Sequence, residues 1–215
     1  MQVFTPRALL LTKLALVGVP LLAAAAVFAF RWSEAMPHAR GAAVAQPIPF
    51  SHKHHAGDDA IDCRYCHAAV ETSRTAGLPA TSTCLNCHAQ LFRGAPMLAP
   101  LHDSLASGRS LAWQRVHDLP DFVYFDHSIH VHKGVSCGEC HGPVDQMPLT
   151  WRVAPLEMQW CLDCHRNPAP HLHPAGEVFS AARNHTVDLH RQQDLMRRLR
   201  IADRRRLTDC STCHR

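Results

Sequence analysis

The sequence is short of the side chains that fill an ordinary protein interior. Aromatic residues make up 7% of the 215 residues, and there are only 2 tyrosines and 10 glycines but 15 prolines. Much of the 47% hydrophobic content lies in the first thirty positions, so the remaining roughly 185 residues would struggle to bury a conventional core. The chain also lacks the repeats and charge of collagen-like, coiled-coil or disordered proteins. We therefore expect something other than protein to supply its apolar interior.

One long apolar run lies at the N-terminus, over residues 8–30, with Lys13 as its one charge. About 20 apolar residues are enough to span the hydrocarbon layer of a membrane, and a lysine near one end can reach the interface. We expect a transmembrane anchor over 13–31, followed by a linker over 32–49 that contains alanine and proline.

The charges beside this run predict its orientation. Arg7 and Lys13 favour a cytoplasmic N-terminus over 1–12, which would place 50–215 on the periplasmic side of a bacterial inner membrane. The alternative is a signal peptide cleaved within the small residues 23–26. In both cases the rest of the chain is exported.

All ten cysteines belong to five copies of one motif, Cys-x-x-Cys-His. This is the attachment motif of haem c: the two thiols form thioethers with the porphyrin, and the adjacent histidine binds the iron from one face. Disulfides would not place a histidine after every second cysteine, and zinc sites would give paired knuckles rather than five identical pentapeptides. We expect five covalently bound haem c groups, attached at Cys63, Cys66, Cys84, Cys87, Cys137, Cys140, Cys161, Cys164, Cys210 and Cys213, with His67, His88, His141, His165 and His214 as proximal iron ligands.

A second pattern, Phe-x-His-x-x-His, begins at Phe50 and again at Phe125, each time shortly before a haem motif. Two histidines three residues apart lie on one side of a helical turn but point away from each other. That geometry suits distal ligands of two different, closely spaced haems. The predicted distal ligands are therefore His52, His55, His127 and His130.

The fifth haem needs one more distal ligand, and the sequence leaves it open. The best histidines are His190, on a helix expected over 186–207, and His117. Met158 and Met147 are alternatives, since a thioether ligand would raise the reduction potential of that haem. Simple packing is an equally good explanation for each of these side chains.

These motifs organise the exported part of the chain. One dihaem block covers about 50–88, a second covers about 125–165, and the fifth haem motif stands at 210–214. Prolines in the connection over 89–124 argue against a long helix there. The predicted fold class is a multihaem cytochrome c: an N-terminal transmembrane helix, then a haem-packed domain of short α-helices and coil with little or no β structure.

The formal charge of +4 is no argument for nucleic acid as a partner, because the ten propionates of five haems would more than offset it. Arginines can pair with propionates, and the remainder could dock an acidic partner or lipid headgroups or form an ordinary solvated face. We expect no nucleic-acid partner.

The repeated histidine pattern is similar to that of class III multihaem cytochromes. The stretch over 113–167, which contains RVHDLPDFVYFDH, CHGPV and MQWCLDCHRN, resembles the membrane-anchored pentahaem cytochrome c subunit (ActA) of alternative complex III. The resemblance covers essentially the exported chain, and the haem number and single anchor agree. It implies a bacterial quinol:electron-acceptor oxidoreductase whose other subunits are an iron–sulfur protein, polytopic membrane proteins at the quinol site and a monohaem cytochrome c.

Haems with a ligand on both faces pass electrons rather than bind substrate, so no catalytic site is expected in this chain itself. Electrons from membrane quinol would leave to a periplasmic cytochrome or an oxidase. One alternative is a stand-alone quinol dehydrogenase of the NapC/NrfH type that feeds a periplasmic reductase. Another is a multihaem reductase in its own right, which would need a haem with an open iron position.

Overall fold

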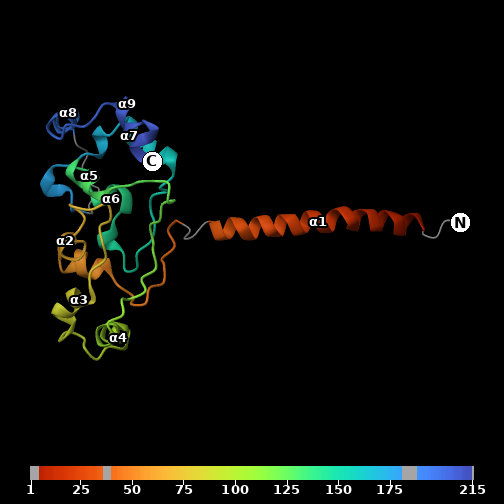
Figure 1. Cartoon of the computed structure of the whole chain (residues 1–215), viewed down its shortest axis with the longest axis horizontal. Coiled ribbons are helices and arrows are strands. Elements are labelled where there is room, and N and C mark those ends of the chain that lie inside the picture. The colour runs from red at the N-terminus through yellow and green to blue at the C-terminus, as the bar shows by residue number, and fades with distance from the viewer. Residues whose placement is uncertain (1–4, 36–39, 181–187, 215) are drawn as a thin grey trace. The chain divides into compact units, whose positions relative to one another are not determined.

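The computed structural model of the chain describes residues 5–35, 40–180 and 188–214 (Figure 1). The chain divides into two compact units, Met1–Ala39 and Arg40–Arg215.

The first unit is built around one helix, α1 (Pro6–Ala35). Its apolar side chains are exposed, and the segment Pro6–Trp32 is long and apolar enough to cross a membrane. The helix extends beyond the predicted anchor over 13–31 at both ends and runs through Pro20 without interruption. An exposed apolar helix of this length fits a single-pass membrane anchor, although a signal sequence would meet the same criteria of length and composition.

The second unit consists of short helices joined by coil (Figure 1). Its described residues form no strand and pair only as two isolated bridges, Ala43 with Trp151 and Val135 with Leu172. The expected mixture of short helices and coil is therefore confirmed. The helices are η1 (Lys53–Asp58, a π-helix), α2 (Cys63–Cys66), α3 (Thr81–His88), η2 (Pro96–Leu98), α4 (Ala99–Ser107), α5 (His127–His132), α6 (Cys137–His141), η3 (Val144–Gln146), α7 (Met158–Arg166), η4 (Ala169–His171), η5 (Ala175–Glu177), α8 (Leu189–Arg198), α9 (Arg204–Leu207) and α10 (Cys210–Cys213).

Aspartates begin several of the helices that carry the motifs. The Asp62 carboxylate accepts from the Arg64 amide at 2.8 Å, and Asp209 accepts from the Ser211 amide at 2.9 Å. Asp126 caps α5 in the same way. Such caps satisfy amides that have no partner inside the helix, so they define where the cysteines and histidines of these short helices lie.

The helix expected over 186–207 is broken in two, and that expectation was wrong in its continuity. Among the described residues, α8 ends at Arg198 and α9 begins at Arg204, with Asp203 as its cap. Between them Arg200 adopts a left-handed conformation at φ 49°, which ends a helix. The Lys133 ammonium, far away in the sequence, donates to the carbonyl oxygen of Leu199 at 2.8 Å and so holds this turn.

The apolar interior of the second unit is small and divided. One cluster joins Ile48, Leu98 and Leu101, and another joins Leu172 and Leu195. In Figure 1, α3 and α4 lie at one end of this unit and α7, α8 and α9 at the other, with α2, α5 and α6 between them. The motif-bearing helices are thus spread from one end of this unit to the other rather than packed around one apolar core.

Candidate haem centres

Four of the five motif histidines face a second histidine across a gap of nearly constant width. A metal bound to a nitrogen at about 2 Å on each side, with each imidazole centroid about 1 Å beyond its nitrogen, requires slightly more than about 6 Å between centroids. The observed gaps fit an iron with two axial imidazoles. The ring centroids are 6.4 Å apart for His52 and His67, 6.1 Å for His55 and His88, 6.3 Å for His127 and His141, and 6.2 Å for His130 and His165.

The same eight rings are held through Nδ1. An Nδ1–H that donates to a fixed acceptor determines the tautomer and leaves Nε2 bare for a metal. Six of the rings donate to backbone carbonyl oxygens: His55 to Ser51, His67 to Gly77, His88 to Leu91, His127 to Arg74, His130 to Asp126 and His165 to Leu207, at 2.7–3.1 Å. The other two acceptors are side chains: Thr150 Oγ1 for His52 at 3.0 Å and His117 Nε2 for His141 at 3.3 Å.

The phenylalanine of the repeated pattern separates the two histidines that follow it. Phe125 stacks on His130 with centroids 4.5 Å apart and meets His127 edge-on at 4.8 Å. Phe50 repeats both contacts with His55 and His52, at 4.5 Å and 4.9 Å. Sequence reasoning assigned no role to these phenylalanines, although their recurrence at the same position was the available signal.

Burial keeps the central histidines neutral. It lowers the pKa of His52 to about 4, with the neighbouring His67 and His55 adding to the effect. It also lowers the pKa of His141 to about 3, where His117 and His127 contribute next, and the pKa of His117 to about 4. The neutral ring is the form that binds a metal, so these rings need not lose a proton at pH 7.

The fifth motif has a different environment. His214 donates through Nδ1 to the Phe122 carbonyl oxygen at 3.0 Å, and its ring lies 5.8 Å from that of Phe122. Of the four candidates for its distal ligand, His190 and Met158 are exposed, Met147 is fully buried, and His117 contacts His141 instead. Within the described part of the chain, the hydrogen bond and the ring contact of His214 are both with Phe122, so the fifth distal ligand stays open.

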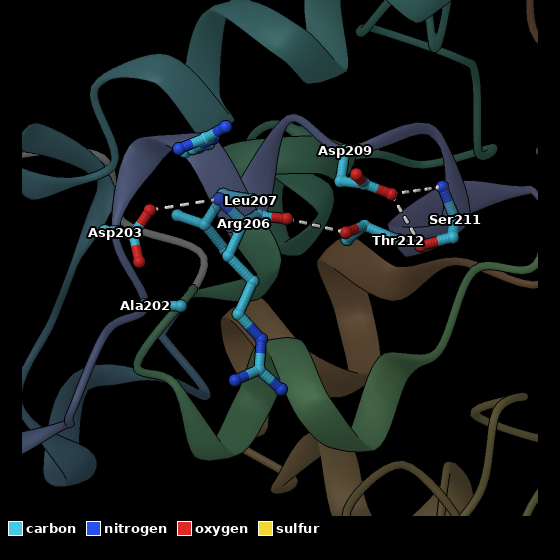
Figure 2. A pocket seen from close by; sticks show the side chains of 8 residues that line it. Ala202, Asp203, Arg206, Leu207, Asp209, Ser211 and Thr212 are labelled. Carbon is cyan, nitrogen blue, oxygen red and sulfur yellow. Dashed lines mark hydrogen bonds between the residues drawn. The ribbon is translucent and has the colours of Figure 1, made fainter.

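A surface hollow of about 580 Å³ lies beside this motif (Figure 2). Thr212 Oγ1 donates to the Arg206 carbonyl oxygen at 2.7 Å, which ties α10 to α9. Arg205 and Arg206 line the hollow together with Asp203 and Asp209, so its lining carries two charges of each sign. Guanidinium groups at such a place are suited to carboxylates, including propionates.

Motif helices that are distant in the sequence lie side by side. The first and second motifs meet where Asn86 Nδ2 donates to the Tyr65 hydroxyl at 2.9 Å. The first and third meet beside two consecutive carbonyl groups. Cys63 Sγ lies 3.4 Å from the carbonyl oxygen of Phe179, and the Cys137 amide donates to that of Val178 at 3.1 Å.

The third motif also contacts the segment that follows the fourth. Glu139, between the two cysteines of the third motif, interacts with His171 Nδ1 at 2.7 Å and with His173 Nε2 at 3.2 Å. The fourth motif reaches the fifth through α9, because His165 donates to the Leu207 carbonyl oxygen at 2.8 Å. Sequence reasoning did not identify Glu139, His171 or His173 as a cluster.

Among the buried polar atoms of the described residues that have no hydrogen-bond partner are Asp145 Oδ1, His102 Nε2 and Arg152 Nε. Buried donors are nearly always satisfied in folded proteins. Arg152 belongs to the coil that forms a bridge near Ala43, and His102 lies on α4, which packs against α3. Both are donors that a buried carboxylate such as a haem propionate could satisfy.

No protein-family model matches the chain. Over 97 residues, 45% of its length, the chain is 37% identical to the multiheme cytochrome c subunit of menaquinone reductase from Nitratidesulfovibrio vulgaris. The matched region also spans only 45% of that relative's length. The chain is thus similar, over less than half its length, to a multihaem cytochrome c subunit, in agreement with covalently bound haem c.

Proposed function

We propose that this chain is a membrane-anchored pentahaem cytochrome c that carries electrons within a quinol-oxidising respiratory complex. The observation that carries the proposal is the set of four histidine pairs with centroids 6.1–6.4 Å apart, each containing one Cys-x-x-Cys-His histidine. Haem c bound there would supply reversible one-electron oxidation and reduction at iron.

The residues of the chain would hold these groups in fixed positions. The ten motif cysteines would form the thioethers, and His67, His88, His141, His165 and His214 would bind iron from the proximal side. His52, His55, His127 and His130 would close the distal side of four haems, so substrate could not reach those irons. Of the three residues predicted as the fifth distal ligand, His190, His117 and Met158, two are exposed, His190 and Met158. His117 contacts His141 instead, so the fifth distal ligand is proposed to be His190 or Met158.

The contacts between motifs support a linear order of haems. η1 and its N-cap supply His55 and His52, which pairs the first haem with the second. α5 supplies both distal histidines of the third and fourth. Cys63 and Cys137 lie against the neighbouring carbonyl groups of Phe179 and Val178, which brings the first and third motifs together. His165 with Leu207 joins the fourth and fifth. We propose that electrons pass along the order second, first, third, fourth, fifth.

The particular complex is proposed to be alternative complex III. The similarity to a menaquinone reductase subunit supports a quinone-linked role, and α1 supports attachment to the membrane. The partners would be an iron–sulfur subunit, polytopic subunits at the quinol site and a monohaem cytochrome c. The haem domain would lie on the periplasmic side and pass electrons to a periplasmic cytochrome or an oxidase.

Mild-detergent extraction from native membranes tests this proposal, with partners and intact mass determined by mass spectrometry. We expect a chain carrying five haem groups that migrates with a large iron–sulfur subunit and polytopic proteins. A chain found alone, or with one periplasmic reductase, would contradict the complex and favour a stand-alone quinol dehydrogenase with the same single anchor. Fewer than five haems per chain would contradict the pentahaem assignment.

A further inference from the structure

The histidine of the third motif differs from the other four in the partner of its Nδ1 atom. His67, His88, His165 and His214 each donate to a backbone carbonyl oxygen. His141 instead contacts another imidazole, with 3.3 Å between its Nδ1 and His117 Nε2. The two half-buried rings are nearly perpendicular, at 80°, with centroids 4.3 Å apart.

This contact is too close for an iron to lie between the two rings. The ring pairs proposed to hold iron are separated by 6.1–6.4 Å, and His141 already has such a partner in His127, whose ring is nearly parallel to it at 9°. His117 therefore lies on the opposite, Nδ1 side of His141. From there it can affect the proposed iron only through the His141 ring.

The direction of the hydrogen bond follows from the proposed ligand role. When Nε2 of a neutral histidine binds a metal, its proton remains on Nδ1, so His141 must donate. His117 Nε2 must then accept, and His117 carries its own proton on Nδ1. An imidazole nitrogen is a more basic acceptor than a peptide carbonyl oxygen, and a stronger acceptor makes the ligating ring more electron-donating.

We propose that His117 is a positioning residue that lowers the reduction potential of the third haem by accepting a hydrogen bond from His141. This inference rests on the proposed ligand role of His141. A more electron-donating axial ring stabilises the oxidised iron, which lowers the potential. In the proposed order of haems the third lies in the middle, so its potential controls passage between the two halves of the chain.

Two variants of the full-length protein test the role of His117, each purified in detergent and titrated by spectroelectrochemistry and electron paramagnetic resonance. His117→Leu removes the acceptor and keeps a side chain of similar bulk. His117→Gln keeps an acceptor at a similar reach. His132→Leu is the matched control, since His132 is exposed on α5 and donates only to the Ser128 carbonyl oxygen.

We expect His117→Leu to raise the midpoint of one of five titrating components, by an amount equivalent to about a tenfold change in its oxidised-to-reduced ratio, which is about 59 mV for one electron. His117→Gln should raise the same midpoint by less, because its amide oxygen is a weaker acceptor than an imidazole nitrogen, and His132→Leu should titrate like the wild type. If His117→Leu does not retain its haems, His117→Ile replaces it with the same expectation.

A titration of the apolar variant that superposes on that of the wild type would overturn the inference, and so would equal shifts in the Leu and Gln variants. Loss of the third haem from both apolar variants would also overturn it, because His117 would then be needed for structure rather than for the potential. Fewer than five low-spin haems in the wild type would instead contradict the proposed function, so the two failures are distinguishable.

Discussion

At the scale of single residues, the Phe-x-His-x-x-His pattern works as one unit in both blocks. In each block the phenylalanine stacks on the second histidine and meets the first edge-on, and this separates two rings that are only three positions apart. Aromatic pairs favour these two geometries because the ring face is negative and the ring edge positive. The pattern thus places two Nε2 atoms toward two different motif histidines.

Replacing His127 by alanine tests the ligand assignment at this scale. We expect one haem to become high-spin and to bind carbon monoxide when reduced, because one axial nitrogen facing His141 is removed. The measurement is the absorption change on adding carbon monoxide to reduced protein. His132→Ala is the control on the same helix and should bind none. A low-spin spectrum unchanged in the His127 variant would count against the assignment.

At the scale of elements, the turn that follows α5 packs against two other segments: the one that follows the fourth motif and the end of α8. Gly134 has φ 79°, and a Cβ there would lie 2.7 Å from the His173 carbonyl oxygen and 2.8 Å from Leu199 Cδ1. The two backbones are also joined by a hydrogen bond here, since the His173 amide donates to the Gly134 carbonyl oxygen at 2.7 Å. Only a residue without a side chain fits this crossing.

Gly134→Ala should therefore destabilise the protein by about 2 kcal/mol, through backbone strain and the two close contacts. That free-energy change corresponds to a fall of about 4–8 °C in the melting temperature for a domain of this size. Circular dichroism in the haem absorption band during heating measures it. Gly176→Ala is the control, because a Cβ at Gly176 meets no atom within 4 Å. Equal melting temperatures for the two variants would contradict the role of this crossing.

At the scale of the whole molecule, the two units need different surroundings for their apolar side chains. α1 exposes its apolar side chains along its whole described surface. Contact of that much apolar surface with water would carry a large unfavourable free energy. The second unit has the opposite problem, because its apolar clusters are few and small. A membrane around α1 and porphyrins between the short helices would resolve both, and each would remove apolar surface from water.

We predict that α1 is retained as an anchor in the mature protein. The chain should stay in the pellet when membranes are washed with alkaline carbonate, and its intact mass should include residues 1–35 in addition to the haems. A cleaved signal peptide would release the protein into the periplasmic fraction with that segment missing. The masses of the chain with and without this segment are readily distinguished, so the measurement decides between a retained anchor and a cleaved signal peptide.

The chemistry of the motifs was open to prediction from the sequence alone, because it is local. A Cys-x-x-Cys-His pentapeptide brings two thiols and an imidazole together wherever it stands, and a spacing of three keeps His127 and His130 on one side of a helical turn. The short aspartate-capped helices follow from the same local reasoning. The fold class of short helices and coil could be predicted for this reason.

The tertiary structure alone decided which distant groups meet. His127 faces His141 rather than another motif histidine, and His117 reaches Nδ1 of that ring across 24 positions. The break after α8 at Arg200 depends on Lys133, which lies 66 positions from the Leu199 carbonyl group it binds. Contacts of this kind depend on how the whole chain closes, and no periodicity or spacing within one segment encodes them. That is the physical reason why the residue that tunes a ligand was visible only in three dimensions.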